Sequence, residues 1–116
     1  MESTGKAAVA EFVATFALIF VGAGAVILNA NGQLDLTGVA LAHGLVLAIM
    51  VSITAHISGG LVNPAVSISL WVTGKLPTSR AGALIVAELA GAVAGAFLLK
   101  FLLPTELFDV GGGGAP

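Results

Sequence analysis

The sequence predicts an all-α membrane protein that crosses the bilayer with three long helices and enters it again with one shorter helix. The 116-residue chain is 58% hydrophobic and only 9% charged, whereas a soluble domain carries about 25% charged residues. The apolar residues also fall into three long blocks. Each block is close to the ~20 residues that a helix needs to cross ~30 Å of hydrocarbon.

The first two blocks cover residues 7–28 and 36–57. Glu11 is the one charged residue in the first, and the second holds two histidines and no formal charge. Residues 29–35, rich in Asn and Gly, read as a turn between them. Residues 1–6 have no strongly basic segment, so we expect the first block to be an uncleaved insertion signal.

Residues 58–72 differ from a spanning block and begin with SGGLVNPA. Asn63 is a favourable N-cap, and Pro64 suits the first helical position. A helix from there to Val72 has about ten residues and a length of ~15 Å, which is half a bilayer. An apolar helix of half length predicts a re-entrant segment.

The third block, residues 81–103, contains Glu88 and Lys100. Residues 104–116 end in GGGGAP and read as a flexible extracytoplasmic tail, similar to an inter-repeat loop that has been cut. Small residues recur at every fourth position in two blocks, which predicts close helix contacts. These stripes are Ala83, Ala87, Gly91 and Gly95 in the third block, and Ala40, Gly44, Ala48 and Ser52 in the second.

The distribution of Lys and Arg predicts the orientation. Lys6, Lys75 and Arg80 fall on one side of the three spans, and Lys100 lies near the other. Because cytoplasmic loops carry more Lys and Arg, we expect residues 1–6 to be cytoplasmic, in a protein of the plasma membrane.

Composition argues against several function classes. The chain has no cysteine, so it offers no disulfide and no thiolate metal site. A net charge of −2 without a basic patch makes nucleic acid an unexpected partner. His43 and His56 have no partners at metal-ligand spacing, and there is no nucleophile–base pair or phosphate loop. We therefore expect neither an enzyme nor a bound metal or cofactor.

The re-entrant segment carries the candidate pore chemistry. Main-chain carbonyls of Gly59, Gly60 and Leu61 at membrane depth are tolerable only along a wet cavity. Asn63 caps the short helix and can keep an amide N–H free, and the helix N-terminus at Pro64 and Ala65 presents positive partial charge. Such an end attracts the oxygen of water and repels cations and protons. The plainer alternative is a Gly-rich turn before an ordinary capped helix.

Four segments in order resemble the major intrinsic protein family of aquaporins and glycerol facilitators: AEFVATFALIFVGAG (10–24), HISGGLVNPAVS (56–67), Arg80, and AELAGAVAGA (87–96). The family fold has two inverted repeats, each with three membrane helices and one half-helix. The resemblance implies an aquaporin-like N-terminal repeat over residues 7–103. A complete pore would need a second repeat, in the same longer chain or another subunit, and complete channels would form homotetramers.

The resemblance also implies roles for single residues. His43 corresponds to the second-helix filter position, where tonoplast intrinsic proteins carry His, and VALAHGLVLAIMV (39–51) resembles theirs. A polar, pH-sensitive lining there suits water, ammonia or other small neutral solutes such as glycerol. The alternative is that His43 is hydrogen-bonded within the bundle. We expect His56 to be a buried structural residue near the loop entrance.

Glu11 matches the family acid that braces the NPA loop, and Thr15 shares its helical face. Both Glu11 and Glu88 need partners inside a membrane. Glu88 stands where the family usually has Gln, and Leu61 where it usually has a bracing His, so the brace itself is in question.

The leading hypothesis is a passive channel module. One alternative is a non-conducting half-repeat that acts as a packing partner in the membrane. A second is a small proton-coupled antiporter with a membrane Glu at Glu11, but such antiporters have four full spans and no re-entrant SGGLVNPA segment.

Overall fold

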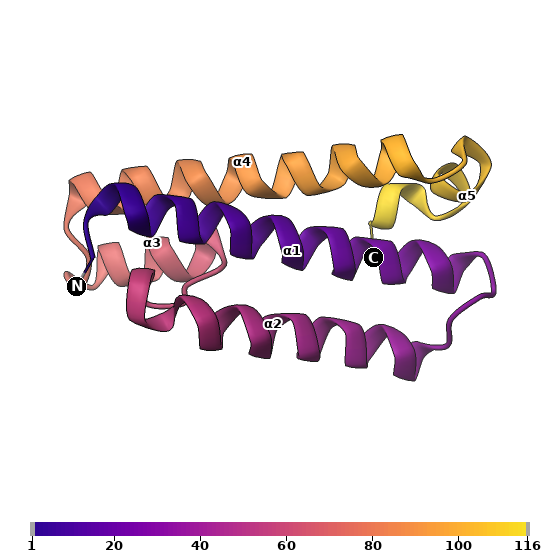
Figure 1. The fold of residues 1–116 in the computed structure, drawn as a ribbon, viewed down its shortest axis with the longest axis horizontal. Helices are drawn as coiled ribbons and strands as arrows, with labels where there is room; N and C mark the ends of the chain where they lie inside the picture. Colours follow the sequence, from indigo (N-terminus) through magenta and orange to yellow (C-terminus); the bar gives the residue numbers. More distant parts are fainter. Residues whose placement is uncertain (1, 116) are drawn as a thin grey trace.

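The structure, a computed structural model, describes residues 2–115, and every regular element within them is a helix (Figure 1). Three helices are long and apolar enough to cross a membrane. This confirms the predicted all-α membrane fold class with three long helices and a shorter one. The elements are α1 (Thr4–Ala30), α2 (Leu36–Ser58), α3 (Pro64–Val72), α4 (Thr78–Leu102), α5 (Thr105–Val110) and the 3-10 helix η1 (Gly112–Gly114).

The long helices lie side by side along the long axis of the molecule (Figure 1). Helix α1 is central and packs against α2 on one side and α4 on the other. The end of α2, all of α3 and the start of α4 lie at the end that also carries the N-terminus (Figure 1). The chain therefore leaves α2, turns inward and comes back through α3 at the same end, which is a re-entrant path.

Local caps explain where the helices begin and end. Helix α1 starts earlier than the apolar block because Ser3 caps it, and its hydroxyl accepts the Lys6 N–H at 3.3 Å. Asp35 caps α2 in the same way through the Gly38 N–H at 2.7 Å. Helix α4 starts at Thr78 rather than residue 81. It follows Pro77, which occupies the N-cap position in an extended conformation without a side-chain hydrogen bond.

Helices α1 and α4 approach closely through glycine. A Cβ atom on Gly91 would overlap the Phe12 carbonyl, and one on Gly95 would lie 2.8 Å from the Phe16 oxygen. This confirms the close contact that the small-residue stripe of residues 83–95 predicts. The other predicted stripe is different, because its four residues are exposed in this chain: Ala40, Gly44, Ala48 and Ser52.

The segment after α4 differs from the expected flexible tail. Residues 105–110 form α5, and the Asn31 amide donates to the Leu107 carbonyl at 2.9 Å. Gly111 and Gly114 pack so tightly on α1 that a Cβ on either would clash with Ile27 or Ala23. Composition predicted flexibility here, but glycine also permits the close backbone contact that orders the segment.

Much of what this small fold buries is polar. The apolar cluster of Ala7, Leu76, Ala81 and Leu84 packs against Leu70 of α3. The buried polar side chains gather around the loop between α2 and α3, which the next subsection describes: Glu11, Thr15, Thr54, Ser58, Ser67 and Glu88.

Candidate functional site

The loop between α2 and α3 has an unusual backbone. Gly59 and Gly60 have φ values of 98° and 66°, and Val62 follows with φ 56°. Val62 is the one non-glycine residue among residues 2–115 with a positive φ. A β-branched residue is disfavoured in this region, so surrounding contacts must hold the loop in place.

Glu11 supplies those contacts from α1. Its fully buried carboxylate accepts the main-chain N–H of Val62 at 2.6 Å and that of Leu61 at 3.2 Å. The Ser58 hydroxyl also donates to it. Thr15, one turn further along α1, donates to the Val62 carbonyl at 3.5 Å. The brace therefore exists although Leu61 replaces the family's usual His, because the main chain of Leu61 and the hydroxyl of Ser58 donate instead.

Glu88 holds the start of α3 from the opposite side. It is fully buried on α4, and the Ser67 hydroxyl lies 2.8 and 2.9 Å from its two carboxyl oxygens. One acid from α1 and one from α4 are thus each bonded to a different serine next to the loop.

Asn63 and the first residues of α3 form the opposite, exposed side of this loop. The Asn63 side-chain oxygen accepts the Ala65 N–H at 2.8 Å, and Pro64 occupies the first helical position. Since the oxygen is used by the cap, the amide N–H₂ of the exposed Asn63 is left as a donor. No described residue donates to the carbonyl oxygens of Gly59, Gly60 or Leu61, so these remain available as acceptors.

His43 lies on α2, in the half of that helix farther from the loop, and its side chain is exposed. Its Nδ1 is 2.8 Å from the Val39 carbonyl. Because a carbonyl only accepts, Nδ1 carries the proton in this contact. The structure does not place His43 in hydrogen-bond contact with any described residue of the loop.

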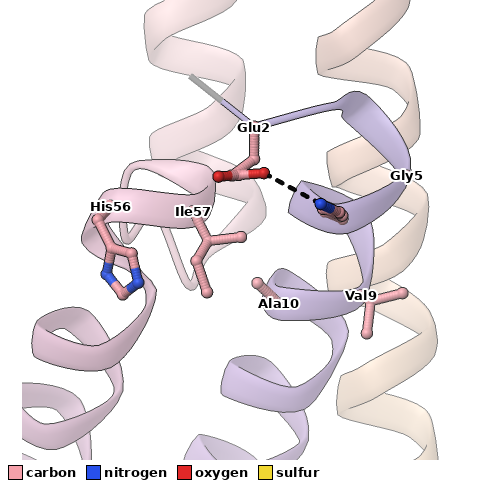
Figure 2. A pocket seen from close by; sticks show the side chains of 7 residues that line it. Glu2, Gly5, Val9, Ala10, His56 and Ile57 are labelled. Atoms are coloured by element: carbon pink, nitrogen blue, oxygen red, sulfur yellow. Dashed lines mark hydrogen bonds and ion pairs between the residues drawn. The ribbon is translucent and has the colours of Figure 1, made fainter.

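His56 is exposed, so the expectation of a buried structural histidine is wrong for this chain. It lines an open pocket of about 590 Å³, where it and Ile57 lie across from Val9 and Ala10 of α1 (Figure 2). Glu2 and Lys6, which form an ion pair at 3.4 Å, also line this pocket. At the end of a span the polar part of the ring can stay in contact with water, so burial is not required.

Two residues of this site were not singled out from the sequence. Ser58 and Ser67 each donate to a buried acid, yet they lie 47 and 21 positions from their partners. The available signal was the acids themselves, because a carboxyl group inside a membrane requires hydroxyl or amide donors nearby. Ser58 at the end of α2 and Ser67 in α3 are hydroxyl donors of this kind on either side of the loop.

The arrangement has two chemically different sides. The buried side consists of acids and hydroxyls that fix the backbone of the loop. The exposed side offers main-chain acceptors at residues 59–61, followed by the Asn63 amide donor and the N-terminus of α3. A small polar molecule that moves along this side could exchange its hydrogen bonds with water for these groups.

The comparisons with known proteins agree with this geometry. The family model described as "Major intrinsic protein" matches residues 2–114. The chain is 41% identical to aquaporin TIP4-4 of Zea mays over 84% of this chain and 41% of that protein. It is 46% identical to the lens fiber major intrinsic protein of Ovis aries over 85% of this chain and 38% of that protein. The probable aquaporin PIP2-8 of Arabidopsis thaliana is 38% identical over 93% and 41%. The chain spans about two fifths of the length of these relatives.

Proposed function

Since this chain belongs to the major intrinsic protein family, whose members are channels rather than enzymes, we propose that it forms the first half of a passive channel for water and small neutral solutes. Its three long apolar helices and its relatives make it an integral membrane protein. We also propose which residues take part in conduction, which solutes pass and which partners the chain needs.

The observation that carries the proposal is the two-sided loop. Glu11 fixes the backbone at Leu61 and Val62 from the buried side, while the carbonyls of residues 59–61 remain without partners among the described residues. Open carbonyls at membrane depth are costly unless they line a wet path. A row of acceptors held rigidly in this way can replace the hydration of a passing water molecule.

The start of α3 supplies the selectivity against charge. The N-terminus of α3 carries the positive end of the helix dipole, and the Asn63 amide adds a hydrogen-bond donor at the same place. A water molecule that reaches this point accepts hydrogen bonds through its oxygen. A cation or a proton meets an unfavourable potential there, which favours neutral solutes.

A second repeat completes the proposed pore. Helix α3 has nine residues and a length of about 14 Å, which covers only half of the bilayer. A second half-helix from the opposite side has to cover the rest, in a longer chain or another subunit. We further propose that complete channels assemble as homotetramers in the plasma membrane, with residues 1–6 in the cytoplasm.

His43 is the proposed filter residue. It is exposed on α2. Residues 39–51 around it resemble the second helix of tonoplast intrinsic proteins, and the chain is 41% identical to aquaporin TIP4-4 of Zea mays. An exposed imidazole gives a polar lining, which suits water together with ammonia or a small polyol such as glycerol.

A second candidate function is a non-conducting module that packs against another membrane protein. The stripe of small residues on α2 favours it, because these four residues are exposed in the structure of residues 2–115: Ala40, Gly44, Ala48 and Ser52. The antiporter alternative is weaker, since residues 2–115 contain three spanning helices and a re-entrant α3 instead of four full spans.

The test is a fusion of this chain to the second repeat of the lens fiber relative, reconstituted in liposomes and followed by stopped-flow light scattering. We expect osmotic shrinkage well above that of empty liposomes, and its loss with Asn63→Leu. The matched control is Gly82→Ala, because a Cβ there meets no atom within 4 Å. Shrinkage at the rate of empty liposomes, from a folded fusion, would overturn the channel proposal in favour of the packing module.

A further inference from the structure

We propose that Gly22 is a positioning residue for His43: by lacking a side chain, it creates the recess in α1 that holds the imidazole ring back from the solute path. Gly22 itself does not touch the solute. The proposal deepens the channel function above and rests on it for the part that concerns selectivity, whereas the position of the ring can be tested separately.

The contact between the two residues is direct. Gly22 is buried on α1 and faces α2 at the level of His43. A Cβ atom added to Gly22 would lie 2.8 Å from Nε2, 3.1 Å from Cδ2 and 3.4 Å from Cε1 of the ring. The far edge of the imidazole therefore occupies the space that the side chain of any other residue at this position would fill.

A second contact fixes the ring from its other edge. Nδ1 is 2.8 Å from the Val39 carbonyl, one turn earlier on the same helix. The ring is thus held between a hydrogen bond to α2 and the bare backbone of α1. It cannot turn away from Gly22 and keep the Val39 hydrogen bond unchanged, because both contacts involve the same rigid ring.

The structure also gives the direction in which the ring would move. Helix α1 closes one side of His43, and the other side is exposed. Carbon atoms in contact are usually about 3.5–4.0 Å apart, so a methyl group at residue 22 would displace the ring edge by about 1 Å. The displacement is toward the exposed side, which is the side that would face the solute.

Displacement of the His43 ring should change the selectivity of the proposed channel. A ring that projects further narrows the path at the filter level, and a wide solute is affected more than a narrow one. Gly22→Ala should therefore lower glycerol permeability more than water permeability. One methyl group in a closely fitting site changes discrimination by roughly 10-fold, and we expect a change of that order or somewhat below it.

Two other glycines are matched controls. Gly44 directly follows His43 on α2, and a Cβ there meets nothing within 4 Å. Gly24 lies on α1 close to Gly22, and a Cβ there meets only the flexible end of Leu99, at 3.2 Å. Alanine at either position changes helix propensity as Gly22→Ala does, without touching the ring.

The first experiment needs no conduction. The chain with His56→Gln keeps one histidine, whose ring nitrogens can be observed by ¹⁵N solid-state NMR in lipid bilayers. We expect the Nδ1 signal to show a hydrogen-bonded N–H, and Gly22→Ala to shift it while Gly44→Ala leaves it unchanged. An unchanged His43 spectrum in Gly22→Ala would overturn the proposal.

The second experiment measures selectivity in the fusion to a second repeat. Gly22→Ala should lower the glycerol-to-water permeability ratio, and the effect should vanish in a His43→Ala background, since no ring remains to be displaced. An equal effect in both backgrounds would mean that Gly22 acts through helix packing, and the proposal would be wrong. A fusion that passes no solute contradicts the channel function instead, and NMR still decides the position of the ring.

A variant that folds poorly still gives a decision. If Gly22→Ala lowers the unfolding temperature in detergent because of the clash with the ring, His43→Ala should restore it in the double variant. Failure of the second substitution to restore stability would show that the methyl group clashes with something other than His43, against the proposal.

Discussion

The Glu11 carboxylate accepts the Val62 N–H at 2.6 Å across 51 positions of sequence, and Val62 has a φ of 56°. Glu11 on α1 therefore stabilises Val62, the loop residue whose positive φ is unfavourable for its side chain. The brace and the strained residue form one unit. Removing the acid should release the strain by changing the loop, and the main effect should be on the geometry of the proposed pore.

Glu11→Gln should destabilise the protein. The carboxylate accepts three hydrogen bonds, from Ser58, Leu61 and Val62, and a glutamine amide has only one acceptor oxygen. At least one buried donor then faces an N–H₂ group, which costs about 1–3 kcal/mol. Thermal unfolding in detergent measures the loss, and Glu2→Gln is the control because Glu2 is exposed. Equal unfolding temperatures for Glu11→Gln and the parent would show that the brace is not needed.

Glu88→Gln should behave in the opposite way. A glutamine there still accepts the Ser67 hydroxyl, and it removes one of the two buried acids, Glu11 and Glu88. Glutamine is also what the family usually carries at this position. We expect stability equal to or above that of the parent, measured in the same unfolding experiment. A loss as large as that of Glu11→Gln would mean that the second carboxyl is as necessary as the first.

Substitutions at Gly60 and Gly74 can separate the effect of backbone strain from the effect of steric crowding by neighbouring atoms. Gly60 and Gly74 both have positive φ, 66° and 79°, so alanine is strained at either. Only at Gly60 does a Cβ also meet neighbours, with Val51 Cγ1 and the Val51 carbonyl both at 3.2 Å. We expect Gly60→Ala to open the loop and speed hydrogen exchange of the Val62 amide, whereas Gly74→Ala should leave that amide protected. Equal exchange rates in both variants would contradict the crowding at Gly60.

The parts of the fold that the sequence predicted are those set by local chemistry. Apolar blocks indicated the three long helices, and Asn63 followed by Pro64 marked the start of the half-helix. What the sequence left open depends on contacts between distant segments. The side chain of Leu61 cannot donate a hydrogen bond, which from the sequence argues against a brace. The Leu61 main-chain N–H nevertheless donates to Glu11, and a main-chain donor has no sequence signature. Likewise, the close contact of Gly22 could not be predicted from the sequence, because its partner His43 lies 21 positions later on another helix.

The orientation gives a further prediction. Lys6 lies in the first turn of α1, Lys75 follows the end of α3, and Arg80 lies in the first turn of α4, so all three are at the same end of the molecule. The excess of positive charge at this end favours a cytoplasmic position for it. A phosphatase or fluorescent reporter fused after residue 116 should therefore report an extracytoplasmic location. A cytoplasmic signal from that fusion, with the reporter shown to be active, would contradict the three-span topology.

The last prediction is that this 116-residue chain will not conduct when it is reconstituted without a second repeat. A pore of this type needs two half-helices that meet from opposite sides, and the described residues contain one, α3. Two copies could supply both only if one were inserted upside down, which the positive end with Lys6, Lys75 and Arg80 disfavours. Parallel copies could still associate through the exposed stripe of α2, but both copies of α3 would then enter the membrane from the same face.

The measurement is stopped-flow osmotic shrinkage of liposomes that hold the purified chain, with empty liposomes and the fused channel as references. We expect the rate of empty liposomes. Even an inverted pair would place the uncharged Val66 after the second NPA, where the family's filter uses Arg, so charge exclusion would be weak. A fast rate that Asn63→Leu abolishes and Gly82→Ala does not would show that two copies build a working pore. The exposed α2 stripe around Gly44 would then be the face to test for their contact, since it is uncovered in this chain.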